Sequence, residues 1–356
     1  MNFSTSSFSF RHFGLGFLLL AFVPGLCLFY LGVWLEPLAG DLTRIGGFSE
    51  RDFGWQNPQL GFKDPLPADE DAYRYRDVWV LGDSFATAWP KLQWQNHLKE
   101  KTGWSIGTQN INRVSIDQLL QDPEFKAHPP KVLILESAER YLTLRLNAPS
   151  KNPILKGPPS APTALGTPEP RMKPLAREPL LRSRDLKAVQ IPFAGRYLLR
   201  TFQRDILGQH PGNTFKLKLS RDGLFSNRKA SELLVFREDL QKEPLWRQMG
   251  IQEMGLRLES LRARVEADGM THLVVLIAPD KLTAYREFLD EARLKPYSEV
   301  SALIGQAPQL LPDTVGAIQR SIEDSTTDVY LPDDTHWGAS GQERIADTLL
   351  HFLKAR

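Results

Sequence analysis

The stretch Val78-Trp79-Val80-Leu81-Gly82-Asp83-Ser84-Phe85 decides how this chain is expected to fold. Its first four residues are apolar and stand between a charged residue and a glycine, which is typical of a buried strand. A segment with helical character, Phe85 to Lys101, follows the serine and is expected to end at Gly103. A strand that runs directly into a helix would deliver Ser84 to the top of a sheet, at the edge where ligands usually bind.

Further buried strands and amphipathic helices alternate along the chain. Lys131–Glu136 and Leu273–Ala278 are short apolar runs of the same kind, and Tyr285 to Arg293 has helical character. Apolar residues recur at spacings of three and four before the last strand and again near the C-terminus, which predicts two helices with one apolar stripe each. Buried strands that alternate with helices predict an α/β fold, with a mostly parallel sheet covered by helices.

The composition changes after Asn147. Nine prolines fall between Pro149 and Pro179, and we expect neither helix nor strand at that density. The sequence therefore predicts a proline-rich insertion at about 148–186. The insertion is also basic, so it is either a solvated excursion or a groove that follows an acidic polymer.

Residues 13–35 carry no charge and are numerous enough to cross a bilayer core of roughly 30 Å as a helix. Arg11 precedes this run, and Glu36 and Asp41 follow it. The positive-inside rule then places residues 1–12 in the cytoplasm and residue 36 onward outside. We expect a single-pass anchor in the cell inner membrane, a juxtamembrane segment at 36–76 and a periplasmic catalytic domain at 77–356. The alternatives are a cleaved signal peptide and a buried core helix.

Charge and cysteine content exclude several classes of protein. A net charge of +2 lacks the strong basic excess that is typical of a nucleic-acid-binding protein. Cys27 is the one cysteine and lies in the apolar N-terminal run, so neither a disulfide nor a thiolate metal site is expected. The histidines show no metal-ligand spacing. We therefore expect no metal, no cofactor and no nucleic-acid partner.

Two segments carry the residues of nucleophilic catalysis. A serine hydroxyl needs a base to remove its proton, and the base is usually a histidine oriented by a carboxylate. Ser84 follows its strand, whereas His336 lies in the segment Asp333-Asp334-Thr335-His336-Trp337 before the last helix. Either Asp333 or Asp334 is close enough in sequence to orient His336. Together these segments predict a serine–histidine–aspartate site.

These residues resemble the SGNH/GDSL hydrolase superfamily, in particular its alginate O-acetyltransferase (AlgJ/AlgX-type) branch. The resemblance rests on four pieces: Gly82-Asp83-Ser84-Phe85, Glu136 with Glu139-Arg140-Tyr141, Pro279-Asp280-Lys281, and Asp334-Thr335-His336-Trp337. The order of the serine and histidine blocks is that of ordinary SGNH hydrolases and the reverse of that in the alginate enzymes.

The resemblance implies roles for these residues. Ser84 is the nucleophile, His336 the base and Asp334 its acid, with Asp333 as the alternative. The implied fold is an SGNH-like three-layer α/β/α domain. The candidates for oxyanion or substrate contacts, beyond the Ser84 amide, are Asn112, Ser115, Arg140, Tyr141, Lys281 and Trp337.

The resemblance also implies an activity. The chain would be an extracytoplasmic O-acetyltransferase that moves an acetyl group through Ser84 to hydroxyls of an exopolysaccharide, with a membrane-bound O-acyltransferase as acetyl supplier. The alternatives are a carbohydrate acetylesterase with the same triad and a non-catalytic scaffold of a polysaccharide assembly machine.

Overall fold

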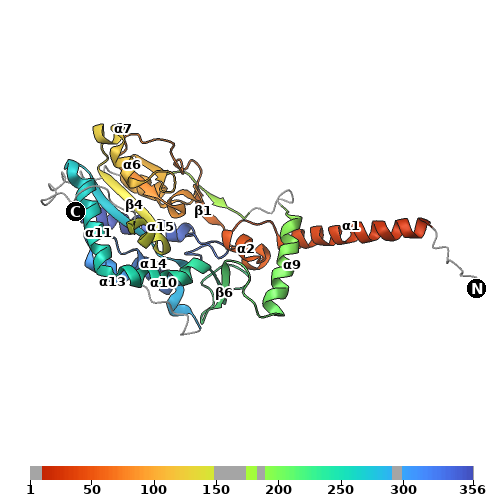
Figure 1. Cartoon of the computed structure of the whole chain (residues 1–356). Coiled ribbons are helices and arrows are strands. Elements are labelled where there is room, and N and C mark those ends of the chain that lie inside the picture. Colours follow the sequence, from red (N-terminus) through yellow and green to blue (C-terminus); the bar gives the residue numbers. More distant parts are fainter. Residues whose placement is uncertain (1–9, 148–173, 183–188, 291–298, 356) are drawn as a thin grey trace, which may run out of the picture.

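A four-stranded parallel sheet forms the centre of the protein in the computed structural model, which describes residues 10–147, 174–182, 189–290 and 299–355 (Figure 1). The strand order is β3-β2-β4-β8, and each neighbouring pair is parallel. The strands are β2 (Val78–Gly82), β3 (Ile106–Asn110), β4 (Val132–Ala138) and β8 (His272–Ala278). The predicted α/β class and parallel sheet are thereby confirmed.

Helices cover both faces of this sheet, so the domain has three layers. Side chains of β2 alternate between two apolar clusters, Val78 and Val80 in one and Trp79 and Leu81 in the other, and all four are fully buried. The first cluster is covered by α5 (Trp94–Thr102), α12 (Lys281–Tyr285), α14 (Thr314–Glu323) and α15 (Ala339–Lys354). The second is covered by α6 (Ile116–Gln121), α7 (Pro123–Ala127), α8 (Glu139–Asn147), α10 (Arg237–Met249), α11 (Ile251–Val265) and α13 (Val300–Gln306).

Two helices begin or end at residues that differ from those predicted from the sequence. The helix expected from Phe85 to Lys101 is divided into α4 (Ser84–Thr87) and α5, because Trp89 has a φ of 54° and Pro90 cannot continue a helix. The helix expected from Tyr285 to Arg293 instead starts at Lys281 and gives way to a 3₁₀ turn at Arg286–Phe288. The earlier start buries Leu282 and Tyr285 in the core. A further 3₁₀ turn, Glu266–Asp268, precedes β8.

Two small antiparallel sheets lie beside the main one. They pair β1 (Gln59–Phe62) with β5 (Arg177–Leu180), and β6 (Thr214–Lys218) with β7 (Glu232–Phe236). Strand β5 corrects the expectation that the proline-rich insertion holds no strand. Pro179 pairs opposite Leu60 in a two-stranded ribbon, and such an edge position tolerates the missing N–H of proline. Residues 148–173 and 183–186 of the insertion lie outside the described residues.

The N-terminal elements are α1 (Phe10–Leu35), α2 (Asp41–Gly46) and α3 (Glu50–Phe53). Helix α1 projects from one end of the domain. Helix α9 (Ile191–Asp205) runs across α1 at the point where α1 meets the domain (Figure 1). The stretch His12–Leu35 is long and apolar enough to cross a membrane, with a mean hydropathy of 2.2. Little of this stretch is buried, which distinguishes it from the core helix of a soluble protein. A signal sequence meets the same criteria of length and apolar composition.

Candidate active site

Ser84 is the first residue of α4 and follows the carboxyl end of β2. The turn before it is fixed by Asp83, whose side chain accepts hydrogen bonds from the N–H of Phe85 at 3.1 Å and of Ala138 at 2.8 Å. The side chain of Ser84 is partly exposed although its neighbours are buried. An N–H at the first helical position has no acceptor within its helix. The Ser84 amide is therefore placed to donate to an oxyanion.

Gly82 and Glu136 pack beneath this turn. The Glu136 carboxyl accepts a hydrogen bond from the Asp83 N–H at 2.8 Å and is fully buried. Burial, together with the nearby Asp83 charge, raises the pKa of Glu136 well above its ordinary value. A Cβ on Gly82 would lie 2.7 Å from that carboxyl and 2.6 Å from the Ala86 Cβ. Only glycine lets the strand end approach β4 this closely.

His336 lies next to this serine turn. Its Nδ1 is 2.5 Å from Oδ1 of Asp334, and its ring packs on Phe85 with 4.9 Å between ring centroids. Phe85 follows Ser84 directly, so the predicted nucleophile and base belong to touching segments. The Nε2 of His336 is buried and has no hydrogen-bond partner among the described residues. This nitrogen is the one that remains to accept a proton from a hydroxyl.

Asp334 and His336 shift one another's pKa in opposite directions. Burial alone would lower the pKa of His336, but the Asp334 carboxylate outweighs burial and raises it above its ordinary value. Burial acts to raise the pKa of Asp334, and the His336 charge with several hydrogen bonds overcomes this and lowers it to about 2. The pair therefore favours a carboxylate beside an imidazole of increased basicity.

Asp333 does not contact the imidazole. Burial and the nearby Glu50 carboxyl raise the pKa of Asp333 well above its ordinary value. Its backbone carbonyl accepts hydrogen bonds from the N–H groups of Leu42 at 3.0 Å and Thr43 at 3.3 Å. Of the two aspartates left open by the sequence, the geometry selects Asp334 as the partner of His336.

Asp41 is a site residue that the sequence reasoning missed. Its carboxylate accepts hydrogen bonds from the Thr335 N–H at 3.0 Å and the Thr335 hydroxyl at 2.9 Å. Its own N–H donates to Oδ2 of Asp334 at 3.3 Å, as does the indole of Trp89 at 3.3 Å. Burial and the Asp334 charge raise the pKa of Asp41 to about 6. The juxtamembrane segment thus forms one wall of the site.

Asp41, Asp334 and His336 also bring one ligand atom each within 4.8 Å of the others, an arrangement that could hold a metal ion. The Nδ1 of His336 already bonds Asp334, and Asp41 is engaged by Thr335. The absence of a metal stays a prediction, which a chelator in the activity assay checks.

Most of the candidate residues for oxyanion or substrate contacts bond or pack against other residues of the fold. Ser115 caps α6 in a reciprocal capping box, and Asn112 accepts a hydrogen bond from Arg145 at 2.8 Å. Tyr141 donates its hydroxyl hydrogen bond to Glu238. Trp337 is fully buried and packs on Phe85 at 4.7 Å between centroids.

Lys281 supports the histidine loop rather than lining a cavity. Its buried ammonium donates to the carbonyl oxygens of Leu331, Pro332 and Asp334 at 2.8, 2.9 and 3.0 Å. Burial lowers the pKa of Lys281 to about 8, because desolvation disfavours the charged form.

Arg140 belongs to a buried polar cluster at the carboxyl ends of β4 and β8. Arg140 pairs with Asp280 at 2.6 Å, and Lys242 pairs with Asp280 at 2.9 Å and with Glu139 at 2.8 Å. Burial and the Asp280 charge raise the pKa of a further member, Asp239, to about 7. The side chains of Glu139 and Arg140 are both buried and bond other partners, so they do not form a surface ion pair with each other.

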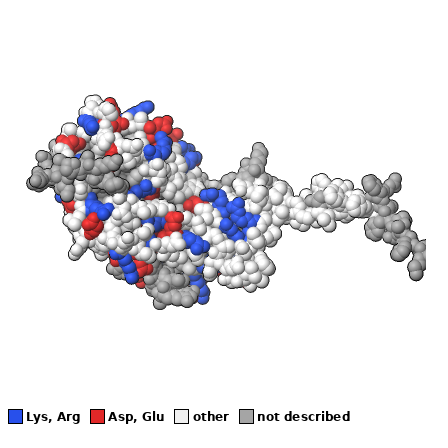
Figure 2. Space-filling view, in the orientation of Figure 1, with Lys and Arg blue, Asp and Glu red and all other residues white. Residues whose placement is uncertain are grey.

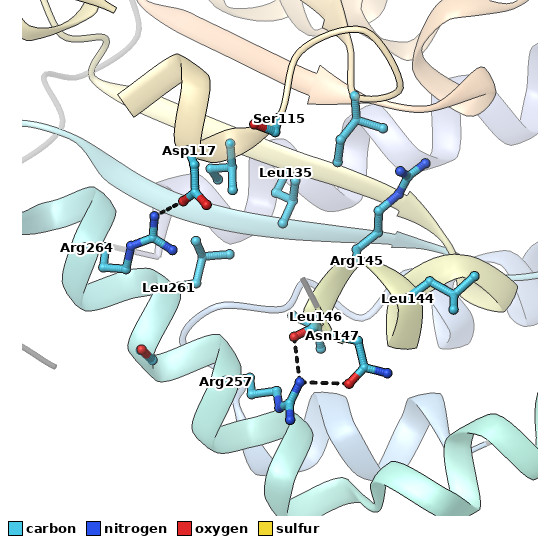
Figure 3. A pocket seen from close by; sticks show the side chains of 13 residues that line it. Ser115, Asp117, Leu135, Leu144, Arg145, Leu146, Asn147, Arg257, Leu261 and Arg264 are labelled. Carbon is cyan, nitrogen blue, oxygen red and sulfur yellow. Dashed lines mark hydrogen bonds and ion pairs between the residues drawn. The ribbon is translucent and has the colours of Figure 1, made fainter. Parts of the chain in front are cut away.

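A cavity of about 540 Å³ lies on the other side of the sheet, between α6, α8 and α11 (Figure 3). Its basic side chains are engaged: Arg257 bonds Leu146 and Asn147, and Arg264 bonds Asp117 (Figure 3). Ser115 lines this cavity, whereas Ser84, His336, Asp334 and Asp41 do not. The cavity is therefore separate from the site.

Comparison with known families gives one match. Residues 234–356 match a family model described as the SGNH hydrolase-like domain of the acetyltransferase AlgX. This part of the chain is similar to that family. The comparisons with curated proteins and with solved structures give no match.

The AlgX-type match covers the histidine block but not the serine block. Asp334, His336 and Lys281 lie within the matched residues, whereas Ser84 and Asp41 lie before them. The predicted resemblance is confirmed, and with it a general acetyltransferase or hydrolase-like role.

Proposed function

We propose that the protein is an O-acetyltransferase in which Ser84 carries the acetyl group as an ester and a sugar hydroxyl of an exopolysaccharide accepts it. The observation that carries this proposal is the ring of His336 packed on Phe85, beside Ser84, with Nδ1 held by Asp334 and Nε2 without a partner among the described residues. The AlgX-type match supports acetyl transfer over other ester chemistry.

The proposed reaction has two matched halves. His336 removes the proton of Ser84 as the hydroxyl oxygen attacks the acetyl carbonyl, and the leaving group of the donor then takes that proton. In the second half His336 removes the proton of the sugar hydroxyl as its oxygen attacks the acetyl carbonyl. The bond between that carbonyl and Ser84 Oγ breaks, and His336 returns the proton to Ser84. Asp334 keeps the imidazole in the tautomer that both halves need.

The location and partners are part of the same proposal. Helix α1 would anchor the chain in the cell inner membrane, with the catalytic domain in the periplasm. Its length and apolar composition support a membrane span. A membrane-bound O-acyltransferase would supply the acetyl group to Ser84.

Transfer and hydrolysis can be separated with the full chain in detergent. An activated acetyl ester serves as donor and an unacetylated oligosaccharide as acceptor, with a chelator in a parallel reaction. We expect an acetylated oligosaccharide by mass spectrometry, abolished by Ser84→Ala. Ser115→Ala is the matched control, because it removes a helix cap and leaves the site intact. Free acetate as the sole product would favour the carbohydrate acetylesterase.

The scaffold alternative requires a test in cells. A protein that only organises other enzymes would keep polymer acetylation after Ser84→Ala, whereas the proposed enzyme would lose it. Comparison with Ser115→Ala at equal protein level removes the effect of expression.

A further inference from the structure

Helix α9 presents an exposed apolar face. The side chains concerned recur at spacings of three, four and seven, which places them on one side of a helix. They are Ile191, Leu198, Leu199 and Phe202, with Ile206 directly after the helix, and they are 42 to 69% exposed. A soluble surface rarely carries so many large apolar side chains together.

The opposite face of α9 is fixed to the protein. Phe193 and Ala194 are buried against Leu35 at the end of α1. Arg200 donates to the carbonyl oxygen of Ile45, and Arg204 donates to those of Gly46 and Gly47 at 2.9 Å each. The helix is thus held on α1 and α2, and its apolar face points away from both.

The position of α9 along α1 is set by their contacts. Leu28 and Leu31 pack with Leu35 against α9, so α9 crosses the last two turns of α1, over about 10 Å of its length (Figure 1). Tyr30 and Trp34 are exposed at the same level. Tyrosine and tryptophan are enriched where a span leaves the hydrocarbon core.

We propose that α9 lies in the membrane surface, with its apolar face in the boundary between headgroups and acyl chains. This inference rests on the proposed anchoring by α1. If α1 spans the membrane, a helix that runs across the end of the span lies along the surface. Lipid therefore covers its apolar face, rather than a second copy of the chain or another protein.

Charge at the base of α1 suits anionic phospholipid headgroups. Basic side chains gather on the domain beside the point where α1 leaves it (Figure 2). Arg44 of α2 and Arg196 of α9 are both exposed. A basic flank beside an apolar stripe is the pattern of an interfacial helix.

The test uses the full chain reconstituted in vesicles of phosphatidylcholine with phosphatidylglycerol. In a Cys27→Ser background, an environment-sensitive dye is attached at Leu199→Cys or Phe202→Cys. Leu256→Cys on α11, which is 67% exposed, is the matched control. We expect brominated acyl chains to quench the two α9 sites roughly threefold more than Leu256→Cys, as for an interfacial helix. Thermal melting checks that each variant is folded.

A label at Leu20→Cys in α1 separates the two ways to fail. Quenching at Leu20→Cys with both α9 sites no more quenched than Leu256→Cys overturns the inference and leaves the anchor standing. No quenching at Leu20→Cys overturns the anchor, and the inference with it. An α9 label shielded from water before reconstitution, in a cross-linkable dimer, would show a second copy as the occupant and would also overturn it.

Discussion

Gly40→Ala tests whether the juxtamembrane segment holds the histidine loop in place. Gly40 precedes Asp41 and has a φ of −82° and a ψ of 150°, which alanine adopts without strain. A Cβ there would lie 2.1 Å from the carbonyl oxygen of Asp333 and 2.5 Å from its carbonyl carbon. The clash is with backbone, so it cannot be relieved by turning a flexible side chain.

The size of the effect follows from this contact. Real Cβ atoms essentially never approach a heavy atom closer than 3.0 Å, so the two segments must separate by about 0.9 Å. A displacement of about 1 Å in a catalytic group can cost about 100-fold in rate. Overpacking of this kind costs about 1–3 kcal/mol of stability. We therefore expect a folded protein with about 100-fold lower kcat/KM.

The assay is turnover of an activated acetyl ester by the full chain, with a thermal melt of the same sample. Gly305→Ala is the matched control, because a Cβ at Gly305 in α13 meets nothing within 4 Å. The control should keep its activity. A Gly40→Ala protein with wild-type kcat/KM would refute the claim that this segment positions the loop.

Four further substitutions address the same loop. Asp334→Asn should lower kcat by about 10³–10⁴-fold through loss of the correct tautomer, whereas Asp333→Asn should leave kcat within about tenfold, as measured by ester turnover. The acid limb of the pH–rate profile should lie above pH 6.5, because His336 must be neutral to act and its pKa is raised. Asp41→Asn removes a negative charge that helps to raise the pKa of His336, so the acid limb of the pH–rate profile should move to lower pH. An acid limb that does not move contradicts this effect of Asp41 on His336. Lys281→Met leaves three carbonyl oxygens without their donor, and a loss of about 3 kcal/mol should appear in denaturant unfolding.

Three strands of the main sheet, β2, β4 and β8, were predictable because their signal is local. The runs before Gly82, within Lys131–Glu136 and within Leu273–Ala278 are apolar throughout, and strands buried on both faces need that composition. The serine and histidine segments were predictable for the same reason, since each motif is contiguous.

The missed features depend on distant residues. Asp41 resembles any acidic residue after an apolar helix, and only the fold shows that it meets Thr335. The choice between Asp333 and Asp334 depends on how the histidine loop turns. Asp334 bonds Nδ1 of His336, whereas the Asp333 carbonyl is held by Leu42 and Thr43, which lie far away in the sequence. The buried partners of Glu139 and Arg140 come from α10 and from the end of β8, and no local pattern connects these segments.

The assembly of the site from three separate stretches also has a consequence for biosynthesis. Asp41 is made first, Ser84 soon afterwards, and the Asp334–His336 pair only after about 250 further residues. Synthesis begins at the N-terminus, so a contact between distant residues can form only after the later residue has been made. The serine turn can form early, but its base arrives almost with the last helix. The proposed nucleophile is thus made long before the proposed base that would activate it.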